Sequence, residues 1–113
     1  MAVELGKIVK ELKLEVRCCK DRLSRPVSGG YVGDLLSDVM ANSREGDIWI
    51  TRQIHQNTVA VASLKEHAAV IFVNGSEPTA ETVSRAEQEG IPLLVSSMPG
   101  FEVVGRIYKV MNP

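Results

Sequence analysis

Aromatic residues are scarce in this sequence, at 4% of its 113 positions. The interior must therefore be built from Val, Ile, Leu and Ala, which is typical of a parallel sheet covered by helices. Long apolar runs are also missing, so no segment is suited to span a bilayer. The amino-terminal stretch MAVELGKIVKEL is amphipathic and lacks the apolar region of a signal peptide. We therefore expect a cytoplasmic protein that does not engage a membrane.

Cysteine is nearly absent, and the two that occur, Cys18 and Cys19, are adjacent. A disulfide between neighbours strains both the peptide and the bond. A zinc site would need further Cys or His ligands at a suitable spacing. We interpret both residues as small apolar side chains buried in a strand, and we expect neither a metal nor a cofactor.

A basic stripe is missing as well. The formal net charge is −1, and acidic residues are interleaved with the Lys and Arg of the first 25 positions. Nucleic-acid binding normally requires clustered positive charge and stacking aromatics. We expect no nucleic-acid partner.

No phosphate loop is present. The glycine-rich run GGYVG is followed by Asp34 and Leu35, where a P-loop requires Lys and a hydroxyl residue. Its spacing also differs from the G-x-G-x-x-G pattern of dinucleotide-binding folds. The sequence therefore excludes a P-loop kinase.

The sequence does contain a succession of strand–helix units. Apolar runs predict strands at residues 47–51, 69–73 and 92–95, and residues 14–18 predict an edge strand. Helices are expected at 57–67, from Pro78 to a stop at Gly90, from Pro99 onward, and along the stripe of Leu5, Ile8, Val9 and Leu12. Such units predict one three-layer α/β domain over residues 1–113, with a largely parallel sheet and helices on both faces.

Four finer features are also expected. Residues 27–33 should bend sharply or approach something closely, and Asp34 should cap a short helix carrying Leu35, Leu36, Val39 and Met40. Glu81 and Arg85 are spaced for an ion pair on one helix. The last helix should bury the stripe of Phe101, Val104, Ile107 and Tyr108.

Candidate ligand-binding residues follow from the sheet, because ligands of open α/β sheets bind beyond the carboxyl ends of the strands. We expect four loops there, at residues 28–30, 51–57, 74–77 and 96–97. The second loop combines hydroxyl, guanidinium, imidazole and amide groups, which suits an anionic or nucleotide-like ligand. The predicted ligand-binding residues are Gly29, Gly30, Thr51, Arg52, His55, Asn57, Asn74, Gly75 and Ser96.

The alternative is that these polar residues only cap the following helix and face water, with Asn57 as an N-cap. His55 has the chemistry of a general base, but the sequence fixes no nucleophile or carboxylate beside it. We predict no catalytic residue.

The run from Ser28 to Val39, SGGYVGDLLSDV, resembles the DRTGG domain family. The likeness continues through residues 46–51, 55–64, 90–93 and 101–102, so it covers nearly the whole chain. Residues 26–30, PVSGG, keep the two glycines of the family's name and place Ser where Thr is usual.

This resemblance implies a regulatory role. DRTGG domains are accessory modules beside CBS nucleotide-sensing domains in some pyrophosphatases and within some phosphotransacetylases. They are similar to the amino-terminal domain of HPr kinase/phosphorylase, which is an α/β domain distinct from the kinase domain. HPr kinase activity is not expected here, and the family offers no settled catalytic residues to carry over.

Three hypotheses follow. The first is a regulatory module without catalytic activity that senses a small anionic ligand or docks onto a metabolic enzyme, and that forms a homodimer to bury more apolar surface. The second is a structural dimerisation or scaffold domain that docks onto a metabolic enzyme and binds no ligand. The third is a small enzyme that uses the loop of residues 51–57.

Overall fold

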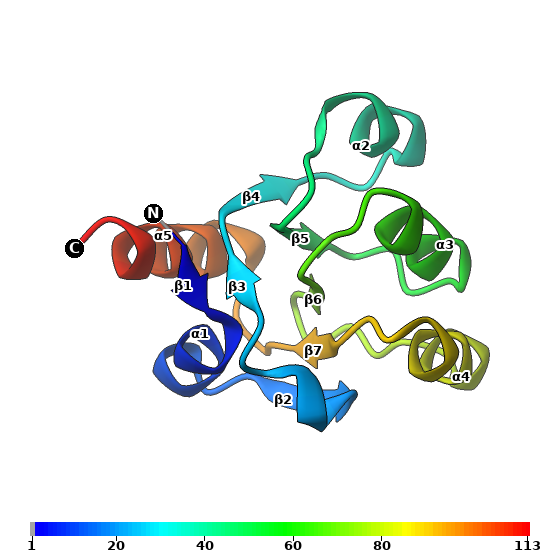
Figure 1. The fold of residues 1–113 in the computed structure, drawn as a ribbon, viewed down its shortest axis with the longest axis horizontal. Coiled ribbons are helices and arrows are strands. Elements are labelled where there is room, and N and C mark those ends of the chain that lie inside the picture. Colours follow the sequence, from blue (N-terminus) through cyan, green and yellow to red (C-terminus); the bar gives the residue numbers. More distant parts are fainter. Residues whose placement is uncertain (1) are drawn as a thin grey trace.

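A single mixed sheet forms the centre of the molecule in the computed structural model, which describes residues 2–113. Its five strands lie in the order β2-β7-β6-β5-β4 (Figure 1). The bounds are β2 Glu15–Cys18, β7 Leu93–Val95, β6 Ala69–Phe72, β5 Asp47–Thr51 and β4 Gly29–Val32. All neighbours pair in parallel except β2, which runs antiparallel to β7 at one edge. The prediction of a largely parallel α/β sheet is confirmed.

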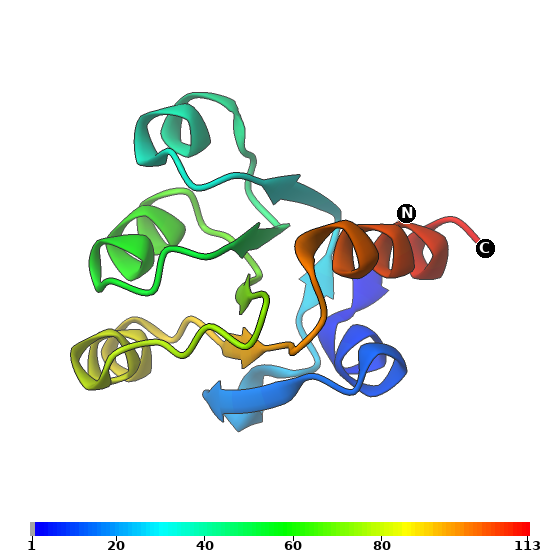
Figure 2. The same ribbon diagram turned by 180° about the vertical axis from the view of Figure 1, so that it is seen from behind.

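Helices cover both faces of the sheet, as predicted. Figures 1 and 2 show the helices in two groups, one along each face of the sheet. The first group is α2 Leu36–Asn42, α3 Asn57–Leu64 and α4 Ala80–Glu89, and the second is α1 Leu5–Leu12 and α5 Gly100–Met111. No helix formed by residues 2–113 is both long enough and apolar enough to cross a membrane.

The alternation of side chains along each strand divides the interior into two cores. In β5, Ile48 and Ile50 face α1 and α5, whereas Trp49 lies among residues of α2, α3 and α4. The predicted stripe of α1 is confirmed, because Leu5, Ile8 and Leu12 are buried in the first core. Both faces of the sheet are covered, which explains why its inner strands are continuous apolar runs.

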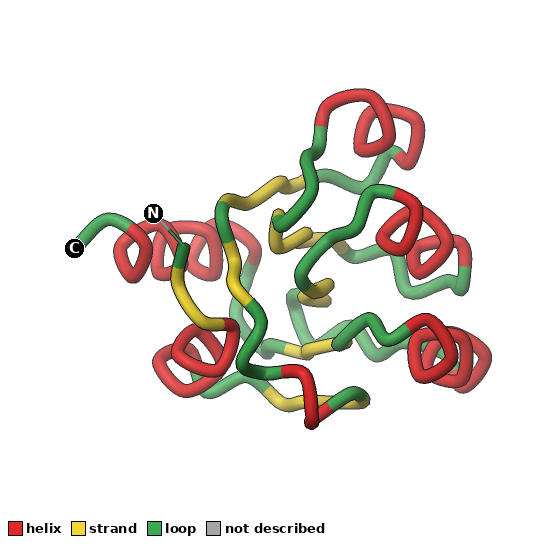
Figure 3. Tube along the Cα trace, in the orientation of Figure 1, coloured by secondary structure: helices red, strands yellow, loops and turns green. Residues whose placement is uncertain are grey.

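The predicted helix boundaries are largely confirmed. The Thr79 side chain accepts a hydrogen bond of 3.2 Å from the backbone of Thr82 and caps α4. Gly90 ends that helix in the left-handed conformation, at φ 73°. Pro99 directly precedes α5. Figure 3 shows the loops that join these helices to the strands.

Two local predictions about helices are wrong. Leu35, and not Asp34, occupies the N-cap of α2, and no side chain caps that helix. The carboxylate of Asp34 binds another loop instead. Glu81 and Arg85 form no ion pair; the i,i+4 pair found among residues 2–113 joins Arg106 to Glu102 at 2.9 Å in α5.

The glycine-rich segment forms a strand, so the expectation of a sharp bend within residues 27–33 is wrong. The alternative expectation of a close approach is confirmed at Gly29, where an added Cβ atom would lie 2.8 Å from the Asp47 carboxylate. Gly29–Val32 forms β4, which pairs in register with residues 47–50 of β5. Hydrogen bonding to a neighbouring strand outweighs the low strand propensity of glycine. A second, two-stranded sheet was also not expected: β1 (Val3–Glu4) pairs with β3 (Pro26–Val27).

The buried face of α5 differs from the predicted stripe. Val103 and Ile107 are buried, whereas Phe101 is 94% exposed and Tyr108 is 69% exposed. The helix carries two adjacent apolar stripes, and the sheet covers only one of them. The other stripe remains at the surface.

Cys18 and Cys19 are free and buried, as interpreted from the sequence. Their thiols approach the carbonyl oxygens of Ile91 and Ala86 at 3.4 and 3.6 Å. Burial raises the pKa of the Cys18 thiol to about 12, so it stays protonated and unreactive near neutral pH. The prediction that both cysteines lie in a strand is wrong for Cys19, which follows β2 and precedes a short 3-10 helix, Lys20–Arg22. Within residues 2–113 no group of three His, Cys, Asp or Glu side chains is placed to hold a metal ion.

Candidate functional site

The carboxyl ends of β5, β6 and β7 converge, because these three strands are neighbours in the sheet. Backbone hydrogen bonds continue beyond the strands. Val73 donates to the carbonyl oxygen of Thr51 at 3.2 Å, and Gly75 donates to that of Ser96 at 2.8 Å. The sequence prediction that these three loops meet at one edge of the sheet is therefore confirmed.

Asp34 organises the loop that follows β5. Its Oδ1 atom accepts hydrogen bonds from the Thr51 hydroxyl at 2.7 Å and from the Arg52 backbone at 2.8 Å. The Gln53 side-chain amide donates to the Asp34 carbonyl oxygen at 3.0 Å. The Thr51 hydroxyl in turn accepts from the Gln53 backbone at 3.1 Å. These bonds fix the backbone from Thr51 to Gln53 against the segment that follows β4.

A shallow hollow of about 450 Å³ lies at this point, lined by Asp34, Arg52, Gln53, Ile54 and Ser76. We call it the Arg52 hollow. Arg52 is exposed, and in the described part of the chain no carboxylate lies within ion-pair distance of its guanidinium. A cation, a carboxylate, an amide and a hydroxyl therefore surround one space. Such a set can bind a polar ligand that carries both hydroxyl and anionic groups.

Sequence reasoning selected Thr51 and Arg52 but not Asp34 or Ser76 as ligand-binding residues. Asp34 was interpreted as a helix cap, because it precedes an apolar helical pattern. Asp34 lies two residues after β4 and therefore at the carboxyl end of the sheet, but this position could not be recognised while residues 29–32 were not predicted to be a strand. Ser76 lies in the loop of residues 74–77, from which only Asn74 and Gly75 were selected.

His55 and Asn57 form the entrance to α3. The Nδ1 atom of His55 accepts a hydrogen bond of 3.2 Å from the Asn57 backbone. Asn57 is the first residue of the helix and Gln56 is its N-cap, so the alternative that Asn57 is the N-cap is wrong. Both His55 and Asn57 are exposed, but neither lines the Arg52 hollow.

Asn74 and Gly75 differ from Ser96 in exposure, and none of the three lines the Arg52 hollow. Asn74 and Gly75 are exposed and adopt the left-handed conformation, at φ 57° and 66°. Ser96 is buried, and its hydroxyl accepts a hydrogen bond of 3.1 Å from the Met98 backbone. It borders a separate hollow that Glu11 and Arg106 also line. Ser96 therefore shapes the turn after β7 and does not line the Arg52 hollow.

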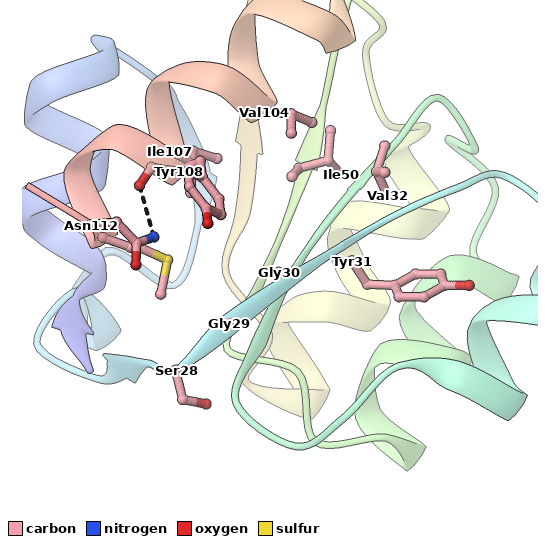
Figure 4. A pocket seen from close by; sticks show the side chains of 11 residues that line it. Ser28, Gly29, Gly30, Tyr31, Val32, Ile50, Val104, Ile107, Tyr108 and Asn112 are labelled. Atoms are coloured by element: carbon pink, nitrogen blue, oxygen red, sulfur yellow. Dashed lines mark hydrogen bonds between the residues drawn. The ribbon is translucent and has the colours of Figure 1, made fainter. Parts of the chain in front are cut away.

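Gly29 and Gly30 lie at the opposite end of the sheet from the other candidates, and their predicted place in a carboxyl-end loop is wrong. Gly29 pairs with Asp47, the first residue of β5, whereas Thr51 is the last. The two glycines line a groove between β4 and α5, shown in Figure 4. The physical reason is that residues 29–32 are themselves a strand, so the carboxyl end of β4 comes only after Val32.

Comparisons with known proteins bear on the fold. No family model matches the chain, and no curated protein matches it. A solved structure does match, with a TM-score of 0.72, at 20% identity and over 92% of this chain. It is the crystal structure of the CBS and DRTGG domains of the regulatory region of Clostridium perfringens pyrophosphatase, complexed with the activator diadenosine tetraphosphate.

The match defines a class of fold. The chain has an α/β fold similar to one found within that regulatory region, and its order of elements is consistent with a DRTGG-like domain. The matched part is 45% of the pyrophosphatase chain, so this protein corresponds to less than half of that structure.

Proposed function

We propose that this chain is a regulatory module without catalytic activity that binds a small anionic, nucleotide-like ligand at the Arg52 hollow. The observation that carries the proposal is the contact between Asp34 and the turn at Thr51 and Arg52. It fixes the backbone that carries an exposed arginine free of any carboxylate partner in residues 2–113. A preorganised site loses less entropy when it binds.

The chemistry of the lining favours this class of ligand. A guanidinium is suited to paired hydrogen bonds with phosphate. A carboxylate accepts hydrogen bonds from sugar hydroxyls, as in dinucleotide-binding folds, and Asp34 offers that function here. Ser76 adds a hydroxyl and Ile54 a half-buried apolar surface. The predicted contacts from His55, Asn57, Asn74 and Gly75 would come from the rims of the adjoining loops.

The similar regulatory region supports a nucleotide in particular, because that protein is complexed with diadenosine tetraphosphate. Catalysis is not proposed, because Nδ1 of His55 accepts its hydrogen bond from the backbone at the entrance of α3. The second candidate function remains a scaffold domain that docks onto a metabolic enzyme. It is favoured by the apolar stripe that α5 leaves exposed.

Calorimetric titration of the full chain tests the proposal, with ATP, AMP, diadenosine tetraphosphate and inorganic phosphate as probes. We expect at least one nucleotide to bind, and Arg52→Ala to weaken its binding by about 1–3 kcal/mol, the usual cost of losing a charge-assisted hydrogen bond. Arg44→Ala is the matched control, because Arg44 is also exposed and lies in a different loop. Absence of binding by all four probes, or equal affinity in the Arg52 variant, would contradict the proposal.

A further inference from the structure

The two edges of the sheet differ in how they are protected. β2 carries Glu15 and Arg17, and its pairing with β7 shifts register between Val16 and Cys18. Charged side chains and irregular pairing are devices that keep an edge strand from pairing with another chain. β4 has neither device: its sequence is GGYV, and its register with β5 is unbroken. The β4 edge is therefore open to a further strand.

An apolar groove of about 290 Å³ runs beside this open edge. Helix α5 packs against β5 and leaves the adjoining surface of β4 uncovered. Val32 is 58% exposed, and Figure 4 shows Val32, Ile50 and Val104 lying in a row, with Tyr108 further along α5. The groove is lined by Ser28, Gly29, Gly30, Tyr31, Val32, Ile50, Val104, Ile107, Tyr108, Met111 and Asn112. None of these residues is charged.

Packing within the chain does not require a glycine at position 30. A Cβ atom added there would meet nothing closer than the Ile48 carbonyl oxygen at 3.5 Å, which is ordinary van der Waals contact. Its backbone is not left-handed either. Gly29 differs, because a Cβ atom there would lie 2.8 Å from the carboxylate of Asp47. Glycine weakens a strand interior, and one use of it is to let another backbone approach closely.

We infer that β4 and this groove form the contact surface for a second copy of the chain. The two β4 strands pair antiparallel about a twofold axis and join the two sheets edge to edge. A twofold contact places the same patch of each copy against the other, and a charge close to the axis would meet the like charge of the second copy. The absence of charge from all eleven lining residues removes that repulsion. An acidic or basic partner, by contrast, would find no complementary charge here.

In such a dimer, the distance between the two α5 helices can be filled by side chains. In the joined sheet, the α5 helix of each copy lies over the β5 strand of the same copy. The two α5 helices lie on the same face of the joined sheet. Three strand spacings, about 14 Å, then separate the two β5 strands. Helices pack at axial distances of about 8–10 Å, so large side chains must fill the remaining space. Tyr108 and Phe101 are exposed on α5 and are of suitable size.

The surface shares no residue with the Arg52 hollow, so the inference does not depend on the proposed function.

Sedimentation equilibrium on the full chain over a range of micromolar concentrations tests the inference. We expect a mass of twice 12.3 kDa for the unaltered chain. Val32→Lys and Tyr108→Lys each place a charge at the twofold contact and should raise the dissociation constant at least about tenfold. Leu64→Lys is the matched control, because Leu64 is as exposed as Tyr108, at 69%, but lies on α3 over the other face. All three positions are exposed, and a thermal melt of each variant verifies folding.

Four results would overturn the inference, three from sedimentation and one from amide exchange. The first is a monomer at every concentration, which would leave the open edge to an extended segment of a different protein. The second is a dimer that both Lys variants leave intact. The third is dissociation by Leu64→Lys to the same extent as by Val32→Lys. Slower amide exchange in β4 on dimerisation would support strand pairing, and unchanged exchange there would contradict it.

Discussion

His67 and Ser43 share a buried hydrogen bond of 2.8 Å between Nε2 and Oγ. The Ser43 hydroxyl donates its own proton to the carbonyl oxygen of Val39 at 2.6 Å, so Nε2 must carry the ring proton. Nδ1 is then an acceptor, and no group in residues 2–113 donates to it. Trp49 packs against the ring, with centroids 5.5 Å apart. Burial lowers the pKa of His67 to about 4, although the negative charge of Asp47 acts to raise it.

We predict that acid destabilises the protein through His67. In the unfolded chain this residue has its ordinary pKa of 6.5, whereas the folded protein disfavours the proton until about pH 4. The free energy of unfolding therefore has its full value above pH 6.5, where His67 is neutral in both states. It decreases as the pH falls from 6.5 toward 4, because the unfolded chain takes up a proton that the folded protein does not. The decrease amounts to about 3 kcal/mol at most. Urea unfolding between pH 7 and pH 4.5 measures it.

The second histidine supplies the control for that measurement. His67→Gln should remove the component of the pH dependence that comes from His67, whereas His55→Gln changes an exposed ring and should retain that component. An NMR titration of the His67 ring protons reports its pKa directly. A midpoint near 6.5 in the folded protein would refute the prediction.

We predict that Asp34→Ala loosens the turn that carries Arg52. The change removes two hydrogen bonds to the carboxylate, from the Thr51 hydroxyl and the Arg52 backbone. It should lower the free energy of unfolding by about 1–2 kcal/mol and speed amide exchange at Arg52. Asp21→Ala is the control, because Asp21 is exposed in the 3-10 helix. Unaltered exchange at Arg52 would show that Asp34 does not hold the turn.

Gly105→Ala should stabilise the protein. Gly105 is exposed within α5, and a Cβ atom added there would meet nothing within 4 Å. Alanine is favoured over glycine in a helix interior by about 0.5–1 kcal/mol. Gly75→Ala is the contrast: its surroundings are equally open, but its φ of 66° should make that change destabilising. Thermal melts of both variants test the pair, and a lower melting temperature for Gly105→Ala would contradict the prediction.

The ion pair between Arg17 of β2 and Glu77 should contribute little to stability. Arg17 Nε and Nη2 donate to the two carboxylate oxygens of Glu77 at 2.8 and 2.6 Å. This contact lowers the pKa of Glu77, so the contribution is present at neutral pH and is lost as Glu77 becomes protonated in acid. Because both side chains are solvated, a double-mutant cycle should give a coupling of about 0.2–1 kcal/mol that falls with added salt. A coupling insensitive to salt would argue against this interpretation.

Much of the fold could be predicted from the sequence because the inner strands are covered on both faces. Residues 48–50 and 69–72 are continuous apolar runs, and few other structures accommodate them. β4 was missed because GGYV has a weak strand propensity and is held by its pairing with β5, which no local pattern reveals. The buried face of α5 was misjudged for a similar reason, since the position of the sheet decides which apolar stripe is covered.

The candidate site was predicted in outline only. The convergence of the loops after β5, β6 and β7 follows from strand order and parallel pairing, which the alternation of strands and helices indicates. The role of Asp34 does not follow in the same way. Its bond to Thr51 joins residues that are far apart in the sequence, and the helical pattern after Asp34 favours the simpler interpretation as a cap. Long-range hydrogen bonds of this kind leave no periodic signal.

The position of β2 has a consequence for the order in which the chain folds. β4, β5 and β6 each find a neighbour within the next strand–helix unit, so they can pair as the chain leaves the ribosome. β2 comes earlier in the chain, yet its sheet partner is β7, where Glu15 meets Val95. That pairing closes the longest loop in the sheet, and such contacts form late. Until β7 has been synthesised, Val16 and Cys18 remain without their partners Leu94 and Leu93, so β2 waits for its sheet neighbour longer than any other strand of this sheet.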